Sequence, residues 1–222
     1  MSLKPQKKSD INKGWMNNRR DRKILIQPEY HLIVTEGTKT EPLYFEAIRD
    51  IVNHKYKERI KLEVCGEGND TLSLFDKARK RAEHDVIEYT HVWVVYDTDD
   101  FPAERINKTA ELCYEYRTGD TEYHAIWSNQ CIELWFLLHF SYFHSNVHRK
   151  DYKDKLSNYL NTIGTGKYEK NRPDMFNILK PYMNTAINNA IRLDGLNKGK
   201  TPTDAAPGTK VHELIMKLKP YL

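Results

Sequence analysis

The hydrophobic pattern alternates between short apolar runs and longer stretches with helical spacing. The short runs are rich in Val, Ile and aromatic residues, which predicts buried strands. They cover residues 30–35, 60–64, 91–96 and 123–127. Between them, apolar residues recur every three to four positions, which predicts amphipathic helices over residues 40–52, 71–89, 102–117 and 132–140. Strands that alternate with long helices predict an α/β fold, with a mostly parallel sheet flanked by helices.

The rest of the chain is polar and helical from residue 151 onward, with a Gly/Pro/Thr-rich loop at about 195–210 and a last helix over 210–218. We therefore divide the chain into a basic N-terminal arm (1–29), an α/β core (30–145) and a helical C-terminal portion packed on that core (146–222). No stretch is long and apolar enough to span a membrane, and the first residues lack the apolar segment of a signal peptide. A cytoplasmic protein is expected.

The net charge of +4 is unevenly distributed. Residues 1–29 contain eight Lys and Arg residues against three acidic ones. Such an arm can contact a phosphate backbone and release counterions, or it can be a solvated tail, and the sequence leaves both interpretations open. The three cysteines lack CxxC spacing, so we expect reduced thiols and not a zinc knuckle or disulfide framework.

Four carboxylates follow the predicted strands. Glu36 comes directly after the first strand, Asp97 and Asp99 follow the third, and Glu133 lies in the first turn of the helix after the fourth. Because the carboxyl ends of parallel strands meet at one edge of a sheet, we expect these side chains to converge. Crowded carboxylates raise one another's pKa unless they hold a cation or share a proton. Oxygen ligands without Cys or His indicate Mg²⁺ or Mn²⁺.

Each of these acidic residues also has a local interpretation. Asp99 or Asp100 could cap the helix that follows them, because acidic side chains accept hydrogen bonds from the first backbone amides. Glu133 could complement a helix dipole. Glu41 fits a capping box that begins at Thr38. The shared location predicted for the carboxylates is what favours a metal site.

Three other patterns suggest binding sites. The segment GLNKGKT (195–201) resembles a phosphate-binding loop, but it is one residue short of the motif and follows a helical stretch, so we reject ATP binding there. His139, His144 and His148 raise a zinc hypothesis. Without an HExxH motif or a cysteine pair, we prefer a structural or substrate-contacting role for His139. Lys39 is a candidate phosphate contact, with a solvated charge as the alternative.

Three segments, in this order, carry a resemblance to a known family: IVTEGTKTEPLYFEAI (33–48), VWVVYDTDDF (92–101) and SNQCIELWFLLHF (128–140). Together they resemble the RloB-like family, a group of bacterial proteins similar to the AbiL-type abortive-infection component. The resemblance covers the core from about residue 30 to 140. Gln130 is a departure, because such families have Pro in that segment, but the acidic residue that follows is in place.

The resemblance implies a Toprim-like fold, in which a glutamate after the first strand and a DxD pair after a later strand bind a divalent metal for cutting or joining nucleic acid. Matched position by position, Glu36 would be a catalytic residue and a metal ligand. Asp97 and Asp99 would be the metal-binding pair, and Glu133 a further catalytic residue. The implied cofactor is Mg²⁺ or Mn²⁺.

Toprim domains serve several reactions, so the fold alone does not name one. The chain is too short for the strand-passage domains of a topoisomerase, which favours phosphodiester hydrolysis of DNA or RNA, including tRNA. We expect Lys39, Asn129 and His139 to contact the substrate. The resemblance also implies anti-phage defence beside an AAA/ABC-type ATPase partner, and it leaves a homo-oligomer open. The alternative is a non-catalytic nucleic-acid-binding or adaptor subunit of the same system.

Overall fold

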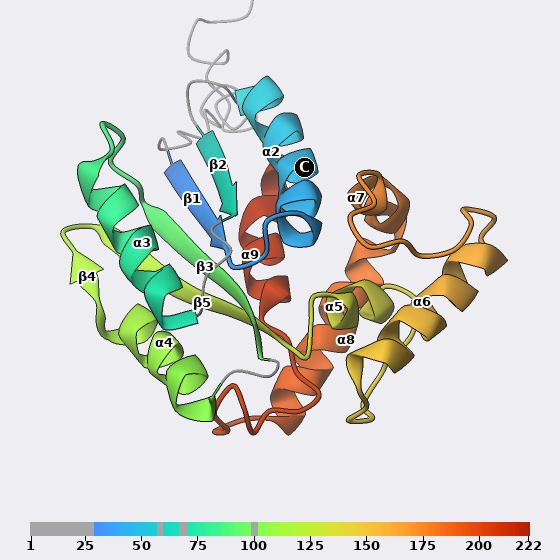
Figure 1. Ribbon diagram of the computed structural model, residues 1–222. Coiled ribbons are helices and arrows are strands. Elements are labelled where there is room, and N and C mark those ends of the chain that lie inside the picture. The colour runs from blue at the N-terminus through green and yellow to red at the C-terminus, as the bar shows by residue number, and fades with distance from the viewer. Residues whose placement is uncertain (1–28, 57–59, 67–70, 99–101) are drawn as a thin grey trace, which may run out of the picture.

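The computed structural model describes residues 29–56, 60–66, 71–98 and 102–222. Nearly all of the basic arm lies outside these ranges, and so do Asp99 and Asp100. The described strands form one sheet in the order β2-β1-β3-β5-β4 (Figure 1). They are β1 (Glu29–Thr35), β2 (Ile60–Gly66), β3 (His91–Thr98), β4 (Arg117–Thr118) and β5 (Thr121–Asn129). All pairs are parallel except the short antiparallel pair of β4 with β5.

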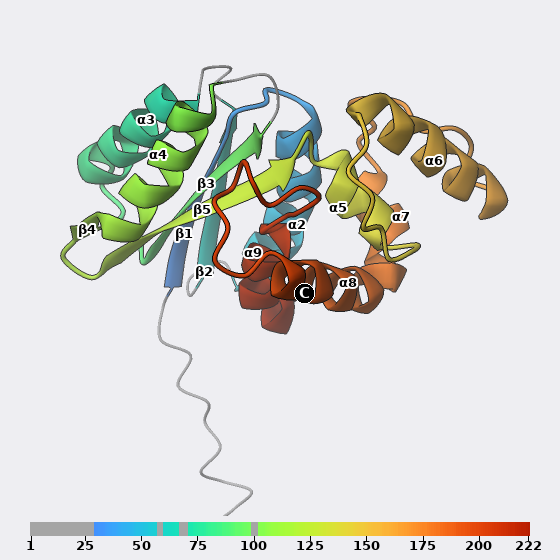
Figure 2. The same ribbon diagram turned by 90° about the horizontal axis from the view of Figure 1, so that it is seen from below.

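Helices cover both faces of the sheet (Figures 1 and 2). On one face lie α3 (Thr71–His84) and α4 (Ala103–Glu115), whose apolar residues pack on Leu32, Val92 and Val94. The other face carries α2 (Thr40–Tyr56) and α9 (Val211–Leu218), with the remaining helices beside them. These are α5 (Glu133–Leu138), α6 (Arg149–Thr162), α7 (Met175–Leu179) and α8 (Met183–Leu196), with the short turns η2 (Lys180–Tyr182) and η3 (Lys219–Tyr221). The predicted α/β fold with a mostly parallel sheet flanked by helices is confirmed.

The segment between α8 and α9 returns to the sheet and runs beside the carboxyl end of β5. Lys210 N donates to Trp127 O and Asn129 N donates to Gly208 O, both at 2.8 Å. A Cβ on Gly208 would lie 2.4 Å from Ala205 O and 3.0 Å from the Trp127 ring, so this approach requires glycine. The helical C-terminal portion therefore contributes backbone to the sheet edge, and its helices share one apolar cluster with β1, β3 and β5.

Two local predictions were wrong. The helix predicted over 71–89 ends at His84, and Val86 is 99% exposed. The cause is Asp85, whose carboxylate accepts from Ile87 N at 3.4 Å and from the Tyr89 hydroxyl at 2.7 Å, and thus competes with the helical backbone. The pattern also missed β4, which pairs with β5 across a turn that contains Gly119 at φ 59°.

None of the described helices has the length and apolar character needed to cross a membrane.

Candidate functional site

The strand order places the carboxyl ends of β1 and β3 at a topological switch point. From β1 the chain continues to β2 on one side and then to β3 on the other, so the sheet order reverses between these neighbours. Ligands of open α/β sheets bind outside the carboxyl ends of the strands at such a point. Glu36 follows β1 directly, and Asp97 is the penultimate residue of β3. Two of the predicted site residues therefore lie at the switch point.

Glu36 is held against β3 by its backbone and its side chain. Its amide donates to Val95 O at 2.9 Å, which extends the pairing of β1 with β3 beyond the last residue of the strand. Its carboxylate oxygen Oε2 accepts from the backbone amide of Asp97 at 3.3 Å. Both residues are partly exposed. The Glu36 carboxylate is thus oriented across the switch point to the residue that carries the second carboxylate.

The loop that carries Glu36 is closely packed. A Cβ on Gly66, the last residue of β2, would lie 2.7 Å from Gly37 O and 2.8 Å from the Cα of Thr38. A Cβ on Gly37 would lie 2.1 Å from a carboxylate oxygen of Glu41, which is buried. The two glycines therefore allow β2 and the Glu41 side chain to approach the backbone that follows Glu36.

Glu41 is the second residue of α2, which begins at Thr40. The Lys39 carbonyl accepts from Leu43 N at 2.9 Å at the start of this helix. The buried Glu41 carboxylate reaches back to Gly37, in the loop before the helix. The capping box from Thr38 to Glu41 stays a prediction.

Glu133 is the first residue of α5 and is 2% exposed. The Tyr168 hydroxyl donates to its Oε1 at 2.9 Å. Burial raises the pKa of Tyr168, and the neighbouring Glu133 carboxylate raises it further, so the hydroxyl keeps its proton and remains a donor. Burial, followed by the charges of Glu133 and Asp97, raises the pKa of the Cys131 thiol. The charges of both carboxylates thus act on Cys131, and Glu133 lies beneath the surface.

The other residues predicted to contact substrate lie in different environments. Lys39 is exposed at the start of α2. Asn129 lies at the end of β5 and is 5% exposed. Its side-chain Nδ2 donates to Thr98 Oγ1 and its Oδ1 accepts from the Tyr152 hydroxyl, both at 3.4 Å. Asn129 thus links β3, β5 and α6.

His139 lies inside the core. It is 1% exposed, its ring packs edge-on against Trp135, and its Nδ1 lies 3.0 Å from the Trp135 carbonyl oxygen. Burial lowers the pKa of His139 to about 4, so the ring is neutral. The other two histidines of the zinc hypothesis are exposed, His144 stacked on Tyr142 and His148 at the N-cap of α6. Among the described residues these three do not form a metal-ligating group.

The structure brings Glu36 and Asp97 together, with Glu133 buried to one side. In the part of the chain described, no three carboxylates of this edge have oxygen atoms that all lie within 4.8 Å of one another. Asp99 lies outside the described residues. The N-cap position of α4 is Pro102. Asp100 also lies outside the described residues, so the alternative in which Asp99 or Asp100 caps this helix stays a prediction. A pair of carboxylates open to water suits Mg²⁺, which keeps several waters and takes one or two carboxylates from the protein.

Sequence reasoning missed Tyr168 and Cys131, which surround Glu133. Tyr168 comes from the segment between α6 and α7, and its spacing carries no signal that it reaches α5. Cys131 lies two positions before Glu133, but only the fold shows that both are buried.

Comparison with protein-family models matches residues 31–218 to the family described as RloB-like protein. The matched range includes the sheet, the switch point and the helices of both faces. Neither the curated proteins nor the solved structures gave a match.

Proposed function

Because the chain belongs to the RloB-like protein family, we propose that it is a divalent-metal-dependent nuclease with its metal site at the switch point of the sheet. The observation that carries the proposal is the juxtaposition of Glu36 and Asp97, in which the Glu36 carboxylate accepts from the Asp97 amide at 3.3 Å. Two carboxylates at the ligand-binding edge of an α/β sheet form a site for a hard cation.

Glu36 and Asp97 would hold Mg²⁺ or Mn²⁺, together with Asp99, which the sequence places two residues further on. The bound ion would supply Lewis-acid stabilisation of the phosphate and a water of lowered pKa. The Glu36 carboxylate is partly exposed and can accept a proton from an attacking water or orient it. Its contact with the Asp97 amide fixes that carboxylate relative to β3.

Glu133 would support this site without touching the substrate. Its carboxylate is 2% exposed and is held by Tyr168, so direct contact with a nucleic acid would require the surrounding residues to move. We assign it a positioning role, in which the Glu133 side chain, held by Tyr168, supports the start of α5 directly after the end of β5.

The substrate would be DNA or RNA, including tRNA, and the family resemblance favours a role in anti-phage defence beside an AAA/ABC-type ATPase. Lys39 is exposed three residues after Glu36 and is suited to contact a phosphate of the bound strand. Asn129 would stabilise the end of β5, because both the nitrogen and the oxygen of its side-chain amide form hydrogen bonds within the fold. We assign the buried His139 no substrate contact.

A cleavage assay tests this function. The full chain, together with its ATPase partner, is incubated with labelled single-stranded RNA, tRNA and duplex DNA, in Mg²⁺, Mn²⁺ or a chelator. We expect metal-dependent cleavage that falls by at least about 100-fold in Glu36→Gln and in Asp97→Asn, because each variant removes a metal ligand. The matched control is Glu46→Gln/Asp50→Asn, which removes two carboxylates on the solvent-exposed side of α2 that interact with Arg49.

Cleavage that survives the chelator, or equal activity in the site variants and the control, would contradict the metal-dependent mechanism. Nucleic-acid binding without cleavage, with the ATPase partner present, would instead favour a non-catalytic adaptor subunit.

A further inference from the structure

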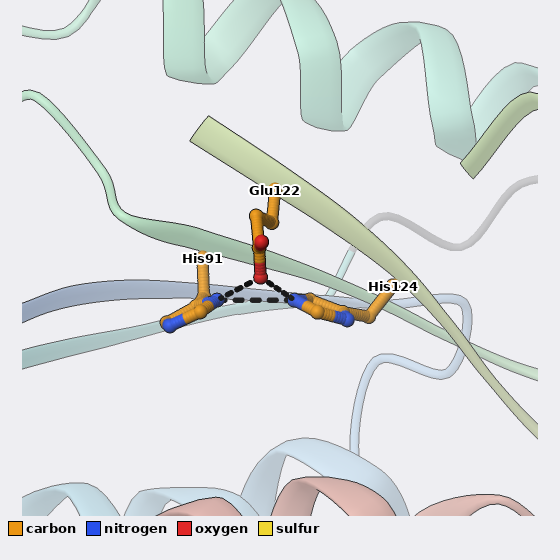
Figure 3. Close-up of side chains that lie close together, drawn as sticks. All are labelled: His91, Glu122 and His124. Carbon is orange, nitrogen blue, oxygen red and sulfur yellow. Dashed lines mark hydrogen bonds and ion pairs between the residues drawn. The ribbon is translucent and has the colours of Figure 1, made fainter. Parts of the chain in front are cut away.

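A second group of metal-ligating side chains lies at the opposite edge of the sheet, where β3 and β5 begin (Figure 3). His91 is the first residue of β3 and is paired across the strands with Glu122, and Trp93 is paired with His124. Because side chains two positions apart on a strand share a face, His91, Glu122 and His124 all project from the same face of the sheet. Parallel pairing of β3 with β5 is therefore what brings these three residues together.

The three potential ligand atoms form a compact triangle. His91 Nδ1 lies 3.0 Å from His124 Nε2 and 3.4 Å from Glu122 Oε2, and His124 Nε2 lies 3.7 Å from the same oxygen. Figure 3 shows the two ring nitrogens and the carboxylate oxygen directed toward one another. A point in the plane of this triangle is about 2.0 Å from all three atoms, which is the ligand distance of Zn²⁺.

Stacking holds both imidazole rings in these orientations. The His124 ring stacks on Trp93, with ring centroids 4.1 Å apart, and the His91 ring stacks on His31 at 5.2 Å. His31 is itself fixed, because Trp93 Nε1 donates to its Nδ1 at 3.2 Å and its Nε2 lies 3.5 Å from Glu29 Oε2. Outer residues that fix the rings of ligating histidines are typical of metal sites.

The solvent exposure of the three side chains and the charges around them also suit a metal ion. The side chain of His91 is 9% exposed, whereas those of His124 and Glu122 are 27% and 49% exposed, so the triangle is open to solvent on the Glu122 side. The nearby cation Lys217 is paired with Glu29 at 2.9 Å, which reduces its repulsion of a bound ion.

The other group of potential metal ligands among the described residues is already paired with a lysine. Asp194, His212 and Glu213 also lie close together, but Lys210 Nζ is 2.6 Å from the Asp194 carboxylate and 2.9 Å from that of Glu213. An ammonium group already occupies the position that a cation would take. Among the described side chains, the ion-pair partners of the Glu122 carboxylate are the two histidines.

We infer that His91 Nδ1, His124 Nε2 and Glu122 Oε2 bind a Zn²⁺ ion at the amino edge of the sheet, separate from the carboxyl-edge site. Two imidazoles with one carboxylate select a transition metal over Mg²⁺. Three protein ligands leave the fourth position of a tetrahedral ion to water, as in catalytic zinc sites. In the metal-bound form the ring protons lie on His91 Nε2 and His124 Nδ1, so the contact between the two rings gives way to metal ligation.

Zn²⁺ titration of the chelator-treated full chain by calorimetry tests this site, with Co²⁺ as a spectroscopic probe of tetrahedral ligation. With excess Mg²⁺ present to occupy the carboxyl-edge site, we expect one saturable Zn²⁺ site, and visible Co²⁺ bands that Zn²⁺ removes and Mg²⁺ does not. Glu122→Gln changes a half-exposed side chain and leaves the core intact, and His124→Gln removes a second ligand. Each should weaken Zn²⁺ binding by at least about tenfold.

The matched control is His144→Gln/His148→Asn, which removes two exposed histidines and retains an N-cap residue for α6. This control should bind Zn²⁺ like the wild type, and so should Asp97→Asn, which alters only the carboxyl-edge site. The absence of saturable Zn²⁺ binding would overturn the inference. It would equally be overturned by wild-type affinity in Glu122→Gln and His124→Gln, or by an equal loss in the control.

Discussion

Two polar side chains of the α5 region, Glu133 and His139, are buried in chemically different ways. Glu133 accepts a hydrogen bond from Tyr168 and lies beside the Cys131 thiol. The Nδ1 of His139 lies 3.0 Å from the Trp135 carbonyl oxygen, and its Nε2 has no hydrogen-bond partner among the described residues. A buried carboxylate requires hydrogen-bond donors, whereas burial disfavours the charged form of the His139 imidazole.

His139 should make the folded state sensitive to mild acid. Burial lowers its pKa from 6.5 to about 4, so between these values the unfolded chain binds the proton and the folded chain does not. The contribution of the neutral His139 to the unfolding free energy is therefore fully present above pH 6.5 and is lost as the pH falls toward 4. We expect His139→Leu to reduce the fall in unfolding free energy between pH 7 and pH 5 by about 2 kcal/mol.

Urea unfolding at the two pH values measures this difference. The exposed His144→Gln variant serves as the control and should show the wild-type fall. The explanation fails if His139→Leu loses as much stability between pH 7 and pH 5 as the wild type does.

At the scale of elements, the loop between β1 and α2 positions Glu36 because β2 ends in a glycine. A Cβ on Gly66 would meet the backbone of residues 37 and 38 at 2.7–2.8 Å, and backbone atoms cannot yield as a flexible side chain can. The position of the Glu36 carboxylate over β3 therefore depends on a residue in the neighbouring strand.

Gly66→Ala should displace this loop. We expect it to lower the unfolding free energy by about 1–3 kcal/mol, as overpacking does, and to weaken Mn²⁺ binding in parallel. Gly195→Ala is the matched control, because a Cβ there meets nothing within 4 Å inside α8, and alanine should stabilise that helix by about 0.5–1 kcal/mol. Equal effects of the two substitutions, in thermal unfolding and in metal titration, would show that the close approach at Gly66 is unimportant.

Much of the element order could be predicted from sequence, because hydrophobic period and strand-type residues are local properties. The strand predicted over residues 91–96, just before Asp97, and the helix predicted to contain Glu133 follow from that pattern. The end of α3 was missed because the Asp85 side chain competes with the backbone, an effect that the apolar stripe conceals. The His91 group was missed as well, because it depends on the register in which β3 pairs with β5.

For the whole molecule, the parallel sheet has two chemically different edges. The carboxyl edge presents Glu36 and Asp97, oxygen ligands that suit Mg²⁺ or Mn²⁺. The amino edge presents two imidazoles and a carboxylate, which suit Zn²⁺. The helices of the C-terminal portion share their apolar cluster with the sheet, so both edges belong to one packed unit (Figure 2).

The central claim, a divalent-metal site formed by Glu36 and Asp97, is tested most directly by Mn²⁺ titration calorimetry. The full chain is used in the Glu122→Gln background, which weakens metal binding by the amino-edge group. We predict one saturable Mn²⁺ site whose affinity falls by at least about tenfold in Glu36→Gln and in Asp97→Asn, and is unchanged in Glu46→Gln/Asp50→Asn. The same Mn²⁺ affinity in all of these variants, or no saturable binding in any of them, would contradict the account.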